Sequence, residues 1–213
     1  SWESLLAAGP KMRDALGDAY YPIDGTFQDF IAMARSRIVQ KTGKPLVDDV
    51  NRRLNCTRED IAEMARLYGG LTRNHSLPAA RVRAAYGNVA QQEMRPWING
   101  QFAGCYLWIS SIDKFTDTLR HGEHVDLASY PLLPGASDAG LLYRPAMMFA
   151  INRQTSHPQE TALLLNFLMN DPVGIRAMGL SRGVPSSAIA RRTLTEDGMM
   201  TGLELDSEAE LAK

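Results

Sequence analysis

Apolar residues recur at intervals of three and four along much of the chain, which is the spacing of one face of an α-helix. In the first sixteen residues, Trp2, Leu5, Leu6 and Met12 fall on one side. Capping residues precede several such stripes, most clearly at Thr57, where Thr-Arg-Glu-Asp has the form of a capping box. The pattern predicts helices over residues 1–16, 27–41, 57–70, 88–99, 112–120, 158–170 and 171–179.

Shorter apolar stretches between these helices predict strands or extended segments at residues 20–23, 102–108, 125–130 and 141–151. The polar residues 43–56 predict an irregular segment. Because strands alternate with helices over most of the chain, the pattern favours the α/β class. In the helix that starts at Pro158, the spacing predicts one buried face, made of Leu163, Leu164, Phe167 and Leu168.

Composition is that of an ordinary globular protein, with 45% hydrophobic and 22% charged residues among 213. The net charge is −1, from 23 basic and 24 acidic residues, so the sequence has no basic footprint for nucleic acid or an anionic membrane. Ala146–Ile151 is among the longest apolar runs and has only six residues, far short of the ~18 that a membrane-spanning helix needs.

Residues with metal-binding or catalytic chemistry are few. Cys56 and Cys105 form no CxxC motif and are either small buried side chains or, in an oxidising compartment, a disulfide. His121 and His124 are three apart but flank Gly122, which favours a solvated loop over a metal site. The sequence contains no HExxH or P-loop motif. We therefore expect no metal, no cofactor and no catalytic residue.

Aromatic and arginine side chains gather instead at the ends of the predicted elements. Trp and Tyr rings offer flat apolar faces that suit the C–H face of a sugar, and arginine offers a planar fork that matches a carboxylate. Trp97 and Tyr106 are more readily explained as core residues. The candidate ligand-binding residues are Trp108, Arg144, Tyr143, Arg95 and Arg182.

Five blocks of sequence resemble, in the same order, family 1 extracellular solute-binding proteins of bacterial carbohydrate ABC importers. They are the Trp-containing helix start at residues 1–9, the block ending in Trp108 at 98–108, the Pro-Leu-Leu-Pro-Gly turn at 130–135, the Ser-His-Pro stretch at 149–168, and the Arg-Gly-Val-Pro turn at 179–185. Residues 94–97, 129–140 and 194–198 are similar to the branch that binds oligogalacturonides, which are acidic pectin fragments.

This resemblance implies a periplasmic-binding-protein type II-like fold, with two α/β lobes and the sugar held in the cleft between them. It assigns residues 1–130 to the second lobe, 131–185 to the hinge and part of the first lobe, and 186–213 to the start of a C-terminal return segment. Family members carry further sequence on both sides of these blocks. We therefore expect the chain to be a piece of a longer protein.

The resemblance also implies roles and partners. Trp108 would stack on the sugar, Tyr143 and Arg144 would enter the cleft, and Arg144 would bind a uronate carboxylate, with Arg95 and Arg182 as further candidates for that contact. The implied partners are an oligosaccharide and the permease subunits of an ABC transporter, and the implied location is the periplasm.

Two other function classes fit parts of this pattern. A carbohydrate-active enzyme on pectin fragments would need a pair of carboxylates or an activated base, and the sequence has no convincing motif for either. The effector-binding domain of a transcription regulator can share the two-lobed plan but would need a helix-turn-helix and a basic face.

Overall fold

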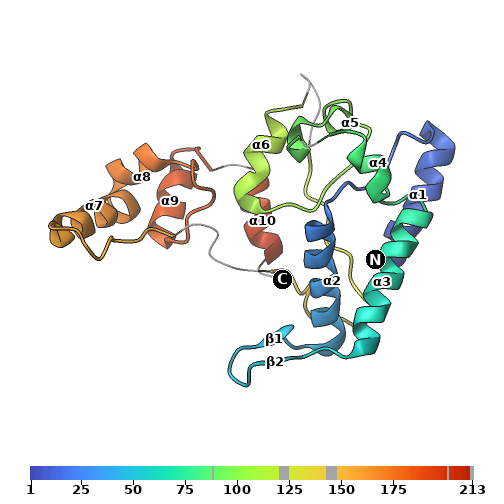
Figure 1. Ribbon diagram of the computed structural model, residues 1–213. Helices are drawn as coiled ribbons and strands as arrows, with labels where there is room; N and C mark the ends of the chain where they lie inside the picture. Colours follow the sequence, from blue (N-terminus) through green and yellow to red (C-terminus); the bar gives the residue numbers. More distant parts are fainter. Residues whose placement is uncertain (88, 120–124, 143–147, 201, 212–213) are drawn as a thin grey trace. The chain divides into compact units, whose positions relative to one another are not determined.

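The computed structural model describes residues 1–87, 89–119, 125–142, 148–200 and 202–211. The chain divides into two compact units (Figure 1). Unit 1 combines Ser1–Leu107 with Lys114–Leu142, and unit 2 combines Trp108–Asp113 with Tyr143–Ala212. Each unit is therefore assembled from stretches of chain that are not consecutive. The predicted division into lobe segments at 130 and 185 concerns the lobes of related proteins and stays a prediction.

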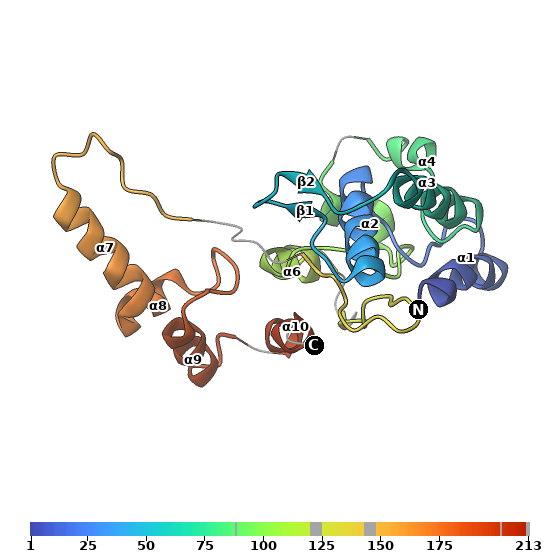
Figure 2. The ribbon, with the colours of Figure 1, turned by 90° about the horizontal axis from the view of Figure 1, so that it is seen from below.

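Three helices make up most of unit 1: α1 (Trp2–Leu16), α2 (Phe27–Thr42) and α3 (Arg58–Arg73). α3 packs against both of the others, as Figure 2 shows. One residue from each of the three helices, Trp2, Phe30 and Leu71, lies in a shared core. The pattern thus predicts where the three helices lie along the chain, although Ile31 and Ile61 on the predicted stripes are 44% and 51% exposed.

Side-chain caps fix where these helices begin. The Ser1 hydroxyl accepts a hydrogen bond from the Ser4 backbone N–H at the start of α1. Thr26 with Asp29, and Thr57 with Asp60, form complete capping boxes at the starts of α2 and α3. The predicted helix start at Thr57 is confirmed.

Charged side chains join α2 to α3. Lys41 Nζ lies 2.7 Å from Asp60 Oδ1 and 2.9 Å from Glu63 Oε2, and Arg37 Nη2 lies 2.9 Å from Glu63 Oε1. The hydrogen bond from Lys41, together with those from the backbone and hydroxyl of Thr57, lowers the pKa of Asp60 to about 2. The side chain of Asp60 is therefore ionised whenever this network is formed at neutral pH.

The predicted helix at residues 88–99 is wrong in the range that the structure describes. It is divided into the 3₁₀ turn η1 (Gln91–Glu93) and the short helix α5 (Arg95–Ile98). Met94 between them has an extended backbone with φ −67° and ψ 133°, and Pro96 lies in the first turn of α5. Proline has no N–H and cannot continue a helix through its own position, so a new helix begins there.

Two further helices of this region differ from prediction. α4 (Ala80–Ala84) was not predicted. α6 (Ile112–Thr116) is shorter than the predicted 112–120, of which residue 120 lies outside the described ranges.

Strands are fewer than the pattern predicts. A hairpin of β1 (Val47–Asp48) and β2 (Arg53–Leu54) occupies the segment expected to be irregular. In the predicted strand at 102–108, pairing is limited to isolated bridges from Phe102 and Cys105, and the described residues 125–130 contain no strand. Most side chains at 126–129 are exposed, so these residues lack the buried face and the neighbouring strand that a ladder requires.

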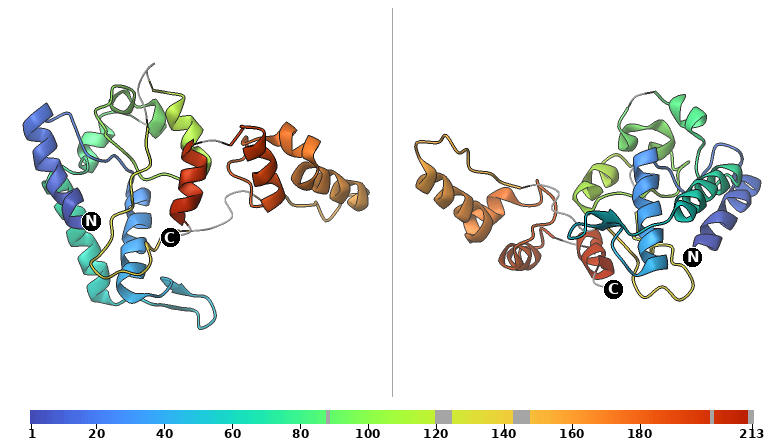
Figure 3. Two further views of the ribbon diagram at one scale, coloured as in Figure 1. Left: turned by 180° about the vertical axis from the view of Figure 1, so that it is seen from behind. Right: turned by 60° about the horizontal axis from the view of Figure 1, so that its bottom comes forward.

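Unit 2 contains the 3₁₀ turn η2 (Ile109–Ser111) and the helices α7 (Pro158–Asn170), α8 (Pro172–Met178), α9 (Ala188–Glu196) and α10 (Gly202–Leu211). Figure 3 shows α7, α8 and α9 side by side. The core of this unit is small and is made of Ile175, Ala190, Leu194 and Met200. Across the described ranges, no helix is both long and apolar enough to cross a membrane.

The buried face predicted for α7 is exposed. Leu163 is 69% exposed, Leu164 55% and Phe167 40%, while Leu168 is half-buried. The periodicity predicts the stripe correctly but not its burial, because no described element of unit 2 covers it.

Candidate functional site

Two extended segments of unit 1 run parallel to each other. Single bridges pair Tyr21 with Phe102 and Asp24 with Cys105, and the Asp24 backbone N–H donates to the Gly104 carbonyl over 2.9 Å. Because the segments are parallel, their carboxyl ends lie at one edge. In open α/β folds the crevice outside the carboxyl ends of parallel strands is the usual ligand site.

An exposed aromatic ring stands at this edge. The first extended segment leads through Gly25 and Thr26 into α2, whose first residue, Phe27, is 64% exposed. The Phe27 ring packs edge-on against Tyr68, with centroids 6.0 Å apart, which limits its motion. A flat, partly fixed apolar ring beside a helix N-terminus can bind the C–H face of a sugar. The sequence carries a signal for its position, since Phe27 lies between Thr26 and Asp29 of a capping box, but the prediction did not use it.

Asp24, at the end of the first extended segment, has a structural role rather than a catalytic one. Its side chain is fully buried; Arg83 Nε and Nη2 donate to the two carboxylate oxygens over 3.1 and 3.2 Å, and Gln91 Nε2 donates over 2.8 Å. With three donors on its two oxygens, this carboxylate has little capacity left to accept a proton or a further hydrogen bond. It therefore fixes the end of the extended segment and is not available as a general base.

Gln40 fixes the Pro-Leu-Leu-Pro-Gly turn. Its Oε1 accepts hydrogen bonds from Trp2 Nε1 and from the Leu133 backbone N–H, both at 3.0 Å. Its Nε2 donates to the carbonyls of Pro131 and Ala139, both at 2.9 Å. One buried side chain thus links α1, α2 and the turn.

The chain on either side of this turn, at Tyr130 and at Gly140, lies against α2. The Tyr130 hydroxyl donates to the Met33 carbonyl over 3.3 Å, and burial raises the Tyr130 pKa. Gly140 has φ 68°, and a Cβ at that position would lie 2.4 Å from the Ser36 carbonyl oxygen. The chain therefore leaves α2 from a fixed point just before the candidate residues at 143 and 144.

The structure separates the predicted site residues into groups. Arg95 is exposed at the start of α5 in unit 1. Trp108 is half-buried in unit 2, where its carbonyl accepts a hydrogen bond from Ser111 N–H over 2.8 Å. Tyr143 and Arg144 lie outside the described residues.

Arg182 and the Trp108 segment are brought together within unit 2. Arg182 is exposed in the turn after α8, and Gly183, with φ 80°, lies so close to Ser110 that a Cβ there would be 2.5 Å from Ser110 Cβ. Arg191 holds the far end of this turn by donating to two of its carbonyls, at 3.0 and 2.8 Å. The turn that contains Arg182 and the segment that contains Trp108 thus lie next to each other in unit 2.

Trp97 and Tyr106, which the sequence assigns to the core, are packed as predicted. Trp97 is 4% exposed and its Nε1 donates to the Phe115 carbonyl over 3.2 Å. Tyr106 is half-buried and stands edge-on to Tyr130, with ring centroids 5.7 Å apart. The buried ring of Trp97 therefore offers no free face to a ligand.

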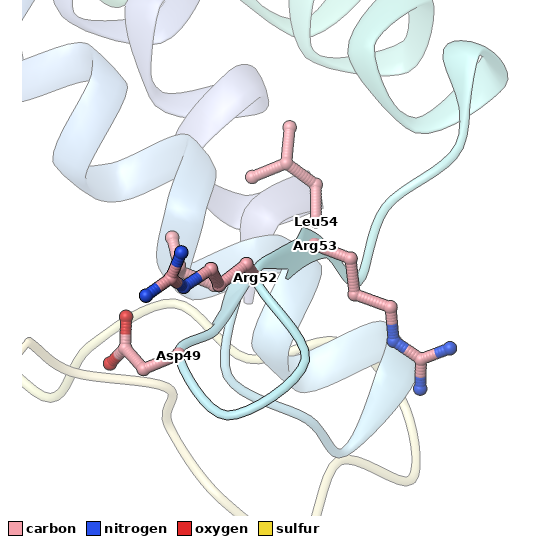
Figure 4. Close-up of a pocket in the computed structure, with 5 residues that line it drawn as sticks. Asp49, Arg52, Arg53 and Leu54 are labelled. Atoms are coloured by element: carbon pink, nitrogen blue, oxygen red, sulfur yellow. The ribbon is translucent and has the colours of Figure 1, made fainter.

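A pocket of about 350 Å³ opens on the β1–β2 hairpin and was not predicted. Val47, Leu54, Asp49, Arg52 and Arg53 line it. Figure 4 shows the Asp49 and Arg52 side chains on one side of the hairpin, with Arg53 directed elsewhere.

The described residues include neither a reactive cysteine nor a cluster of metal ligands. Both cysteines are free, and burial, aided by the charges of Asp24 and Asp29, raises the pKa of Cys105 to about 12. A thiol with that pKa is not a nucleophile at neutral pH. Among the described residues, no group of three or more His, Cys, Asp and Glu side chains could hold a metal ion.

The chain is similar over its whole length to solved structures of periplasmic binding proteins. One is a periplasmic oligogalacturonide binding protein from Yersinia enterocolitica, solved with saturated digalacturonic acid; it is 41% identical, and the match covers 100% of this chain and 52% of that one with a TM-score of 0.88. Another is a periplasmic solute binding protein from Pectobacterium atrosepticum, 32% identical over 100% of this chain and 54% of that one, with a TM-score of 0.93.

A de novo designed cysteine esterase also matches, at 40% identity over 100% of this chain and 51% of that one, with a TM-score of 0.82. No family model matches the sequence, and no curated protein does. The chain spans about half the length of the solved structures that it matches. These matches confirm the predicted α/β solute-binding fold, of which this chain is a helix-rich part.

Proposed function

Starting from a sequence and fold that the whole chain shares with periplasmic solute-binding proteins, we propose that it is part of the carbohydrate-capturing component of a bacterial ABC importer. The observation that carries this proposal is the match at 41% identity to a protein solved with digalacturonic acid. The proposed location is the periplasm, and the proposed protein partners are the permease subunits of the transporter.

We propose an acidic oligosaccharide as the ligand. Within unit 2, its sugar faces would lie on Trp108 and its carboxylates would be bound by Arg182, with Tyr143, Arg144 and Arg95 as the further candidates that the resemblance implies. The exposed ring of Phe27 is a separate candidate stacking surface on unit 1. Arg182 and Arg95 are both exposed, so they can receive a carboxylate without breaking an internal ion pair among the described residues. Arginine binds carboxylate through two parallel hydrogen bonds, which a neutral sugar cannot accept in the same way.

Simple magnitudes set the number of contacts required. Covering one indole face removes about 100 Å² of apolar surface, worth roughly 2–3 kcal/mol at ~25 cal/mol per Å². A charge-assisted hydrogen bond contributes about 1.5–3 kcal/mol. A micromolar ligand needs about −8 kcal/mol after the cost of association. One stack and one arginine do not reach that value, so the 213-residue chain alone is expected to bind weakly.

We propose no bond-breaking step. The buried Asp24 carboxylate is occupied by Arg83 and Gln91, and the thiol of Cys105 is protonated at neutral pH because of its raised pKa. The chain is similar to a designed cysteine esterase, but Cys105 lacks the reactive thiolate that a cysteine nucleophile needs. Two assays exclude or establish catalysis: release of nitrophenol from an ester, and absorbance of the unsaturated product that a pectin lyase would form.

The binding proposal is tested by thermal shift and titration calorimetry with digalacturonate and neutral digalactose, on the longest available form of the protein that contains this chain. Digalacturonate should raise the unfolding temperature and digalactose should not. Trp108→Ala and Arg182→Gln should each weaken binding, while the matched control Arg192→Gln, exposed on α9 in the same unit, should not. Stabilisation by the neutral sugar alone would show that the arginines have another role.

A further inference from the structure

The β1–β2 hairpin has an exposed apolar pair on one of its two faces. Val47 and Leu54 are directly paired across the two strands, so their side chains lie on the same face. They are 41% and 62% exposed and line the pocket shown in Figure 4. The next pair, Asp48 and Arg53, belongs to the opposite face, where Arg53 Nε donates to Asp48 Oδ2 over 3.2 Å. Single apolar side chains are common on surfaces, so the charged residues beside the apolar pair decide what it fits.

One acidic and one basic side chain complete this face. Asp49 and Arg52 are exposed and line the same pocket, and with Val47 and Leu54 they are here called the hairpin face. In the part of the chain that the structure describes, neither charged side chain forms an ion pair or a hydrogen bond, whereas Asp48 between the strands accepts three. Arg52 has φ 51°, a left-handed conformation that is uncommon for a residue other than glycine and that is often kept at functional positions.

The hairpin face is complementary to itself. A second copy, related by a twofold axis that runs parallel to the strands between the two faces, would lay β1 of one copy over β2 of the other. Val47 of each copy then faces Leu54 of the other. Asp49 of each copy likewise faces Arg52 of the other, which gives two symmetry-related pairs of opposite charge. Every side chain of the hairpin face therefore meets one of matching chemistry.

We propose that the hairpin face binds the hairpin face of a second copy of this chain and forms a weak symmetric dimer. The balance of charge argues for this occupant, because a purely acidic partner would be repelled by Asp49 and a purely basic one by Arg52. A hairpin this short covers less than the ~1,200 Å² of a standard interface, so we expect a Kd on the order of 0.1 mM. The dimer needs no sugar, so it stands or falls separately from the proposed function.

Sedimentation equilibrium over a range of concentrations tests the dimer on the longest available form of the protein that contains this chain, without sugar. A monomer–dimer equilibrium is expected, and added salt should weaken it. Asp49→Arg and Arg52→Asp each turn both attractive contacts into repulsive ones, so each should raise the Kd by about tenfold or more. The matched control Arg81→Asp, at an exposed position of α4 in the same unit, should leave the Kd unchanged.

Two combinations of these variants separate the symmetric dimer from unspecific association. The double variant Asp49→Arg with Arg52→Asp exchanges the two charges and should restore the wild-type Kd. A one-to-one mixture of the two single variants should associate more tightly than either variant alone, because only the mixed pair has opposite charges at both contacts. A protein that stays monomeric at the highest concentration, a dimer that neither reversal weakens, or a double variant as weak as the single ones would overturn the proposal.

Discussion

Replacing Gln40 by leucine should loosen the loop that leads to the candidate residues 143 and 144. Leucine has a similar volume but removes four hydrogen bonds, to Trp2, Leu133, Pro131 and Ala139. At roughly 0.5–1.5 kcal/mol for each bond, the loss is about 2–6 kcal/mol. Because the loop residues are half-buried or exposed, water can reach part of what is left unpaired. We therefore expect the substitution to lower the free energy of unfolding by about 2–4 kcal/mol.

Urea unfolding, followed by the fluorescence of the buried Trp2, measures the free energy, and hydrogen exchange at the Leu133 amide reports the loop directly. Exchange at that amide should accelerate, because its acceptor is Gln40 Oε1. Gln28→Leu, at an exposed position of the same helix, is the matched control and should change stability by less than about 0.5 kcal/mol. If Gln40→Leu unfolds at the wild-type urea concentration and Leu133 exchanges at the wild-type rate, the link that we assign to Gln40 does not exist.

Three further perturbations have defined outcomes. Asp60, whose pKa is lowered to about 2 in the folded chain, stabilises the fold above its unfolded pKa near 3.8; that stability should be lost as pH falls from about 4 to 2, and Asp60→Asn should flatten this acid limb in thermal unfolding. Arg83→Leu leaves the Asp24 carboxylate buried without its main partner and should cost about 3–5 kcal/mol in urea unfolding, whereas unchanged stability would mean that the pair is not buried in solution. Gly183→Ala should displace the turn from Ser110 and shift the emission of Trp108 nearby; an unchanged spectrum would contradict the close approach.

Local signals in the sequence predict the helices well. Thr57 with Asp60 and the Pro158 start depend on a few consecutive residues, and both are found where predicted. The split at Pro96 shows the limit of periodicity, because a single proline interrupts an otherwise regular stripe. The β1–β2 hairpin was missed since its turn is stabilised by the Asp48 carboxylate, which accepts from Asn51 and Arg53, rather than by a glycine dipeptide.

Burial and the site are harder to predict, because they depend on contacts between distant residues. Leu163 and Phe167 have the spacing of core positions, yet no described element covers them. Gln40 bonds to residues more than 90 positions away, and no sequence pattern marks it. The approach of Gly183 to Ser110 likewise joins segments about 70 residues apart. The sequence predicts which residue types bind a sugar acid, while the fold determines which of them meet.

The discontinuous make-up of unit 1 has a consequence for biosynthesis. Its three long helices are complete at Arg73, but the extended segment beside Tyr21 and the turn bound by Gln40 come from residues synthesised much later. The early helices keep part of their apolar surface uncovered until those later residues are present. Unit 1 therefore cannot complete its core before the segment that ends at Leu142 is available.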